Sequence, residues 1–243
     1  MKTGAFRMLA VLGWLWCAVT PTPATIILDT VLVGDVANSA DTTVMQDGSS
    51  GYGSVSYTYR IATNEVTNGQ YTEFLNAVDA SGANLHALWN SGMTDNVNGG
   101  VLFNAGAQDG SKYSLKPGYG NRPVISVDFF DAMRFANWLN NGQGSGDTET
   151  GAYTLSLGGL APRNAGVTVW IPSEDEWYKS AFYDPTPGAG GGDNWWLYPT
   201  RSNLTPTSID PNGSDQNSAN YARGFTTDVG GYTLAKSYYG TFD

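Results

Sequence analysis

Cys17 is the only cysteine in the 243-residue sequence, and it lies in the apolar segment at the N-terminus. The rest of the chain therefore has no thiol with which to form a disulfide, a thiolate metal site or a cysteine nucleophile. Any domain after that segment must be held together by packing and hydrogen bonds alone. A single domain of this length buries roughly 70 to 75% of its unfolded surface, so a substantial core is available.

His86 is likewise the only histidine. Its isolation excludes His-dependent catalytic triads and zinc sites built from several histidines. We expect His86 to be a packing or surface residue.

Residues 1–24 have the pattern of a secretory signal peptide. Lys2 and Arg7 supply a positive start, and residues 8–19 form an apolar run of the length of a signal-peptide core. That run is too short to cross a bilayer comfortably. We expect cleavage of this segment, no membrane span in the mature chain, and a secreted, periplasmic or cell-envelope location.

The balance of charges excludes one class of partner. The formal net charge is -10, and only 14% of the residues are charged. Because no cluster of Lys and Arg offsets this charge locally, the chain would repel a phosphate backbone, and we exclude nucleic-acid binding. The acidity is compatible with bound calcium, although a solvated acidic surface explains the same composition.

Two segments have the pattern of capped amphipathic helices. The first has Thr67 and Gln70 in the positions of a capping box, and Gly82 is its expected stop. The second is capped by Asp128, with Asp131 three residues on, and ends at residues 141–142. Each carries an apolar stripe with the spacing of one helix face, made of Tyr71, Phe74, Leu75 and Val78 in the first and Ala132, Phe135, Ala136 and Leu139 in the second.

Alternating apolar residues predict strands over residues 55–61 and 167–171. Residues 90–120 are rich in Gly and Asn and lack periodicity, so we interpret them as long surface loops.

Three adjacent carboxylates, in Glu174, Asp175 and Glu176, raise the hypothesis of an acid/base or metal site. Ser173 precedes them, however, and with Glu176 it forms a capping box. Glu174 and Asp175 would then lie at the positive end of the helix dipole. We favour this structural interpretation.

Six short phrases, in order along the chain, resemble the sulfatase-modifying-factor family, whose best-known members are the formylglycine-generating enzymes. The phrases are residues 65–71 (EVTNGQY), 121–124 (NRPV), 131–138, 172–177 (PSEDEW), 196–199 (WLYP) and 219–222 (ANYA). One domain over residues 26–243 is the simplest interpretation of a sequence without internal repeats, and the resemblance covers essentially everything after about residue 50. The resemblance also implies an α+β fold of the irregular C-type-lectin-like kind, with few regular elements and long loops.

The chain departs from the family's enzymes in one chemical respect. In those enzymes a pair of cysteines near the C-terminus binds copper and uses oxygen to convert a substrate cysteine to formylglycine. Thiolates suit copper(I), and none is present after Cys17, so copper is not supported here. Residues 239–243 resemble the stretch that in the family runs into the C-terminal catalytic region, and we expect either a fragment or a shortened, noncatalytic member.

The resemblance also implies one possible calcium site. Asn220 through its side chain, Tyr221 through its carbonyl and Tyr232 through its backbone match positions that hold a structural ion in the family. Gly230 or Gly231 stands where a carboxylate would help. A purely structural role for Asn220 is the alternative.

Three functions compete. The first is a noncatalytic module that binds a peptide, protein or glycan through Trp195, Trp196 and Tyr198, although such close aromatic residues also pack internally. The second is the N-terminal part of a formylglycine-generating or related oxidase whose catalytic cysteines lie beyond Asp243. The third is a calcium-dependent glycan binder, which rests on analogy of fold.

Overall fold

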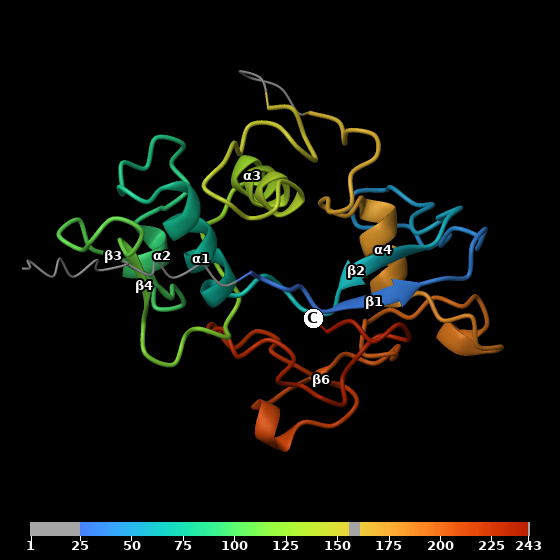
Figure 1. Ribbon diagram of the computed structural model, residues 1–243. Coiled ribbons are helices and arrows are strands. Elements are labelled where there is room, and N and C mark those ends of the chain that lie inside the picture. The colour runs from blue at the N-terminus through green and yellow to red at the C-terminus, as the bar shows by residue number, and fades with distance from the viewer. Residues whose placement is uncertain (1–24, 156–160, 243) are drawn as a thin grey trace, which may run out of the picture.

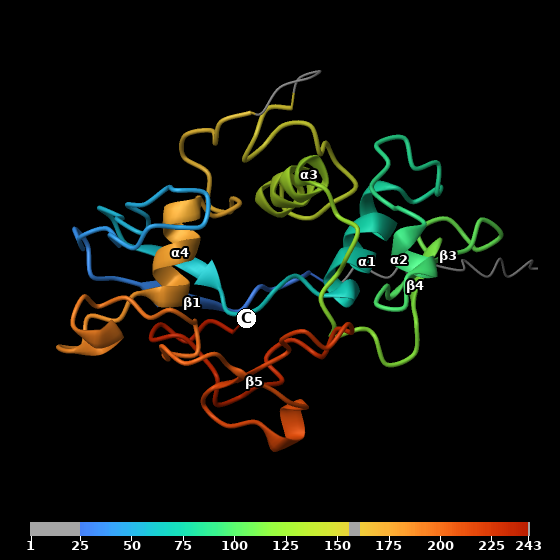
Figure 2. The same ribbon diagram turned by 180° about the vertical axis from the view of Figure 1, so that it is seen from behind.

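The computed structural model describes residues 25–155 and 161–242. Its helices and strands are short and form separate groups, which agrees with the expected α+β class. In Figure 1, helices α1 (Asn68–Val78) and α2 (Gly92–Asp95) lie on one side of the molecule, and helix α4 (Glu174–Phe182) lies on the other. Helix α3 (Phe129–Asn140) stands between the two sides, as the view from behind in Figure 2 also shows.

In the described part of the chain, six strands form three separate two-stranded sheets. Strands β1 (Thr30–Val33) and β2 (Tyr59–Ala62) are antiparallel, as are β3 (Val101–Phe103) and β4 (Tyr113–Leu115). Two further strands pair in parallel in the C-terminal part, and two 3₁₀ turns complete the described elements; they are β5 (Thr207–Ser208), β6 (Ser218–Ala219), η1 (Ala189–Gly191) and η2 (Pro211–Gly213).

The largest group of buried apolar side chains lies where α1 meets α3, β3 and β4. Phe74 is fully buried there, and its ring centroid lies 5.3 Å from that of Phe135. The predicted stripe of α1 faces this core, with Tyr71, Phe74 and Leu75 buried and Val78 packed against it. The α3 stripe is divided: Phe135 and Leu139 pack in this core, whereas Ala136 belongs to a separate cluster with Met133, Ala152 and Tyr153. A second cluster joins β1 to β2 through Val33, Tyr59 and Ile61.

Local hydrogen bonds explain why the three longer helices begin where they do. Complete capping boxes are present at Thr67, Asp128 and Ser173, each with both reciprocal bonds formed. These satisfy main-chain N–H groups that a helix start leaves without partners. The capped starts predicted from the sequence are confirmed, although α1 ends before Gly82, at Val78.

The strand predicted over residues 167–171 is wrong. This segment has no strand partner, because its main-chain groups bond to side chains instead. The N–H of Thr168 donates to Asn140 Oδ1 at 3.0 Å, and the Val169 carbonyl accepts from the same amide. The N–H of Ile171 donates to the Tyr153 hydroxyl at 2.9 Å.

Two other expectations need correction. The strand expected over residues 55–61 is confined to Tyr59–Ala62, and Tyr57 is 43% exposed, so the alternation fails at that position. The loops expected over residues 90–120 contain α2, β3 and β4, with Met93, Val101 and Tyr113 buried. Elements of three or four residues are too short to show the periodicity on which the prediction depended.

The C-terminal segment returns to the first sheet. The N–H of Phe242 donates to the Thr63 carbonyl at 2.9 Å, directly after β2. Within residues 25–155 and 161–242, no helix has the length and apolar character needed to cross a bilayer. The expected signal peptide, residues 1–24, lies outside the described residues.

Candidate functional site

The aromatic block of the sequence is divided between the interior and the surface. Trp195 is only 4% exposed. Its ring lies between those of Tyr178 and Tyr183, with centroid distances of 5.4 and 4.9 Å. Gly53 completes the pocket around the indole. Trp195 therefore anchors its loop in the protein, which is the internal role considered for it from the sequence.

Trp196 and Tyr198 are partly exposed, and Leu197 between them is 57% exposed. Trp177 on α4 is 46% exposed, and its ring packs edge-on against Phe182 at 5.7 Å. The Phe182 carbonyl accepts the N–H of Trp196 at 3.0 Å, which brings the loop against α4. We call this surface the aromatic shelf; it consists of Trp177, Phe182, Trp196, Leu197 and Tyr198.

Polar contacts hold the shelf in place. The indole N–H of Trp196 donates to Asp184 Oδ2 at 3.2 Å, and Asp184 is itself buried. Burial favours a raised pKa for Asp184, but hydrogen bonds from Thr186 and Trp196 outweigh it and lower the pKa. The Leu197 N–H donates to Asn203 Oδ1 at 3.0 Å. An ionised Asp184 thus supports an apolar surface that stays exposed.

Asn220, the first candidate calcium ligand, has one side-chain atom with a hydrogen-bond partner and one without. Its Nδ2 donates to the Phe225 carbonyl at 2.7 Å. Its Oδ1 is buried and has no hydrogen-bond partner among the described residues. An unsatisfied buried carbonyl oxygen costs free energy unless a cation or water contacts it, so this atom fits an oxygen ligand for Ca²⁺.

The other two candidate ligands bond to adjacent residues, Ser208 at the end of β5 and Ile209 directly after it. The Tyr221 carbonyl accepts from the hydroxyl of Ser208, and the hydroxyl of Tyr232 donates to the Ile209 carbonyl at 2.7 Å. The described residues contain no group of three His, Cys, Asp or Glu side chains able to hold a metal. An ion here would therefore be held chiefly by neutral oxygens.

The three adjacent carboxylates have the structural role favoured from the sequence. Glu176 is 1% exposed, and its carboxylate accepts the Ser173 N–H at 2.7 Å and the Tyr57 hydroxyl at 2.7 Å. Trp170 and Arg163 donate to it as well, at 3.1 and 3.3 Å. Burial favours a raised pKa for Glu176, but these donors outweigh it and lower the pKa.

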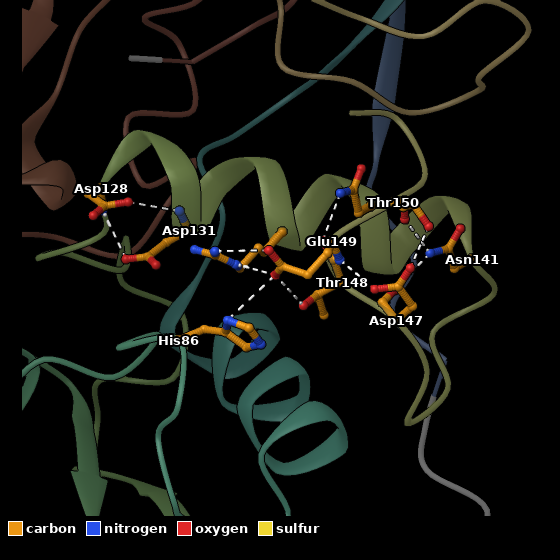
Figure 3. A network of polar contacts seen from close by, with 10 residues as sticks. His86, Asp128, Asp131, Asn141, Asp147, Thr148, Glu149 and Thr150 are labelled. Atoms are coloured by element: carbon orange, nitrogen blue, oxygen red, sulfur yellow. Dashed lines mark hydrogen bonds and ion pairs between the residues drawn. The ribbon is translucent and has the colours of Figure 1, made fainter. Parts of the chain in front are cut away.

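His86 belongs to a polar network at one face of α3, shown in Figure 3. Its Nδ1 lies 3.6 Å from Glu149 Oε1, and the imidazole side chain is 45% exposed. Arg134 donates to both oxygens of Glu149, at 2.6 and 3.1 Å. His86 is a surface residue, as expected, and its imidazole lies beside this ion pair.

Asp131, at the start of α3, is a functional candidate that the sequence interpretation took only as a helix cap. It is 4% exposed, and burial raises the pKa of its carboxyl to about 6. Its Oδ2 accepts the Asp128 N–H at 3.2 Å, as Figure 3 shows. The Asp131 carboxyl therefore changes charge near pH 6. The sequence showed that Asp131 belongs to a capping box but did not show that its side chain is buried.

Two adjoining clefts were also not predicted. The first, of about 560 Å³, is mainly apolar and lies between β2, α3 and residues 168–172. The second, of about 530 Å³, has Asp29, Glu65 and Glu73 in its lining. Both are within the size range of ligand sites.

Comparison with known proteins agrees with the pattern of phrases in the sequence. Residues 30–243 match the model of the sulfatase-modifying factor enzyme 1-like domain. No curated protein and no solved structure matches the chain. The matched range contains α1, α3, α4 and all six described strands. The chain belongs to the family of sulfatase-modifying factor enzyme 1-like domains.

Proposed function

We propose that this domain is a noncatalytic binding module that takes a peptide, protein or glycan on the aromatic shelf. The observation that carries the proposal is an exposed aromatic surface on a rigid support. Trp196 and Trp177 remain accessible, while Trp195 and Asp184 fix the loop from inside. Exposed aromatic patches with a polar surround are typical of interaction sites.

The chemistry of the family's oxidases does not fit the described residues. That chemistry needs two thiols, and no cysteine follows Cys17 in this sequence. The residues that make up the shelf contribute aromatic rings and main-chain groups, which suit stacking and hydrogen bonding to a ligand. A binding role therefore uses what this chain contains.

The proposal extends to fold, location and metal. A C-type-lectin-like arrangement and export by residues 1–24 are part of it, supported by family membership and by the N-terminal sequence pattern. A calcium ion at Asn220, Tyr221 and Tyr232 is the second element, supported by the unpartnered Oδ1 of Asn220. Calcium at this position would make calcium-dependent glycan binding the form of the function to test together with the first.

The test is a screen of glycan and peptide arrays with the purified chain, with and without Ca²⁺. Ligands found in the screen should bind at least tenfold more weakly to Trp196→Ala and Trp177→Ala. Leu85→Ala, which removes an 87% exposed apolar side chain near α1, is the matched control and should bind as the parent does. Equal binding by all three variants would exclude the shelf. Oxidation of a sulfatase cysteine peptide by this chain would contradict the noncatalytic assignment.

A further inference from the structure

The apolar cleft of about 560 Å³ separates the chain around β1 and β2 from helix α3. Residues 25–30 alternate between exposed and partly buried side chains, and the partly buried ones line the cleft: Ile26, Leu28 and Thr30. Since alternate side chains of an extended chain point to the same side, these three form one wall. In both Figure 1 and Figure 2, α3 lies across from the sheet of β1 and β2, with no described helix or strand between them.

The opposite wall is the apolar stripe of α3. Its side chains extend over about 10 Å of the helix axis, and they are Ala132, Phe135, Ala136 and Leu139. Further apolar side chains in the lining come from Val66, Val124 and Val127. Residues 168–172 close the cleft near α4. An occupant would therefore meet hydrocarbon on two sides along about two turns of α3.

Polar side chains in the lining already have partners inside the protein. The Gln143 amide forms two hydrogen bonds with the main chain of Ile26, at 2.7 and 2.8 Å. The hydroxyls of Tyr59 and Tyr71 both donate to main-chain carbonyls. A polar occupant would give up hydrogen bonds to water and find few unpaired groups in return, which costs free energy.

The two charged residues of the described lining favour neither sign of charge in an occupant. Glu176 is 1% exposed, and the donors described above surround its carboxylate. Arg60 is exposed at the mouth, where its Nε and Nη2 donate to Thr30 at 2.8 and 2.7 Å. A cationic group would meet Arg60, and an anionic group would meet the three carboxylates of the adjoining cleft. Electrostatics therefore favours an uncharged occupant.

The two walls select a hydrocarbon over a polypeptide or water. A polypeptide would bring main-chain N–H and C=O groups against the α3 wall, where the described side chains are apolar. Water in such a space would likewise lack partners, and apolar cavities are known to stay dry and to take up apolar molecules. The volume of the cleft is within the range of small-molecule sites.

We propose that this cleft binds an uncharged molecule with a single hydrocarbon chain, which lies between the wall of residues 26–30 and the α3 stripe. The polar end of the molecule lies at the mouth, beside Arg60 and Thr168, where both side chains are exposed. Burial of hydrocarbon supplies the affinity. This site is distinct from the aromatic shelf and does not depend on it.

The probe is 1-decanol, titrated into the full chain and followed by isothermal titration calorimetry. Binding is expected, with a negative heat-capacity change and with nuclear Overhauser effects between decanol methylene protons and the methyl groups of Leu28, Val127 and Leu139. Decanoate and decylammonium ions should each bind at least tenfold more weakly. Absence of decanol binding, contacts only to methyl groups outside the cleft, or equal binding of either ion would overturn the proposal.

Variants of the protein test the position of the site. Ala132→Trp fills the cleft from the α3 wall and should weaken decanol binding at least tenfold, whereas Ala165→Trp, at an exposed position outside the cleft, should leave it unchanged. Thr168→Trp narrows the mouth and gives a second test if Ala132→Trp does not fold. Trp196→Ala should bind decanol as the parent does, so failure of the shelf and failure of this site are distinguishable. Full binding by a folded cleft variant would contradict the site, as would a dimer of the unliganded chain that covers the same methyl groups.

Discussion

The indole of Trp195 packs directly on the α-carbon of Gly53. A Cβ at that glycine would lie 2.8 Å from Trp195 Cζ3 and 3.1 Å from Tyr178 Cδ1, and the backbone there has a positive φ of 84°. The loop that contributes Trp196, Leu197 and Tyr198 to the aromatic shelf is therefore supported by a residue far away in the sequence. A side chain at position 53 would act on the shelf without touching its exposed residues.

Gly53→Ala should destabilise the domain by about 2–4 kcal/mol, because it combines an unfavourable φ with overpacking against Trp195. Gly51→Ala is the control: its φ is 91°, but nothing lies within 4 Å of the added Cβ. That variant should lose only about 1 kcal/mol. Urea unfolding followed by tryptophan fluorescence measures both, and equal losses would show that the Trp195 contact has no specific effect.

Glu176→Gln should reduce stability at pH 7 by about 2–3 kcal/mol, because the buried carboxylate accepts hydrogen bonds that an amide accepts less well. The pKa of Glu176 is lowered in the folded state, so the carboxylate stabilises the fold above the ordinary pKa of 4.5. That stabilisation is lost as the pH falls through the lowered folded pKa. Unfolding free energies of parent and variant from pH 7 to pH 3 should therefore converge, and a constant difference would contradict the assignment.

Asp131→Asn should have the opposite pH dependence. Burial raises the folded pKa of Asp131 from 3.8 to about 6, so its stabilising protonated state is fully present below pH 3.8 and lost as the pH rises through about 6. Asp131→Asn should therefore be more favourable to stability at pH 7 than at pH 4, by about 1–2 kcal/mol. The carboxyl carbon shift of Asp131 gives the pKa directly by NMR, and a titration midpoint below 4.5 would exclude this role.

Calcium should raise the melting temperature if the Asn220 site binds it. With a dissociation constant of about 1 mM, as in weak extracellular sites, 10 mM Ca²⁺ adds about 1.4 kcal/mol. The melting temperature should then rise by about 3–6 °C, and Mg²⁺ at the same ionic strength should have a smaller effect.

Asn220→Ala should abolish this rise, whereas Asn212→Ala, at an exposed asparagine in the preceding turn, should retain it. Differential scanning fluorimetry is sufficient for all three chains. An equal calcium response in Asn220→Ala would place the ion elsewhere.

Structure that depends on hydrogen bonds between residues close together in the chain could be predicted from the sequence. The starts at Thr67, Asp128 and Ser173 each depend on bonds between residues three apart, and all three were correct. Residues 167–171 could not be predicted in the same way, because their partners are the side chains of Asn140 and Tyr153 and not another strand. Apolar residues do alternate in this segment, but the alternation does not indicate which groups form hydrogen bonds with its main-chain N–H and C=O groups.

The candidate sites show the same difference between what neighbouring residues determine and what distant contacts determine. The sequence singled out Trp195, Trp196 and Tyr198 by composition, but packing on Gly53, Tyr178 and Tyr183 separates the buried Trp195 from its partly exposed neighbours. The apolar cleft of about 560 Å³ depends on how far α3 stands from β2. No local pattern encodes that separation, so the cleft could not be predicted.

The capping boxes have a consequence for how this family can diversify. Because each box is closed by its own residues, as in Ser173 with Glu176, the start of the helix does not depend on the length of the segment before it. Insertions and deletions in the connecting loops can accumulate over evolution without shifting the register of α1, α3 or α4. The exposed surfaces can thus change from one relative to the next while the helices that support them stay in place.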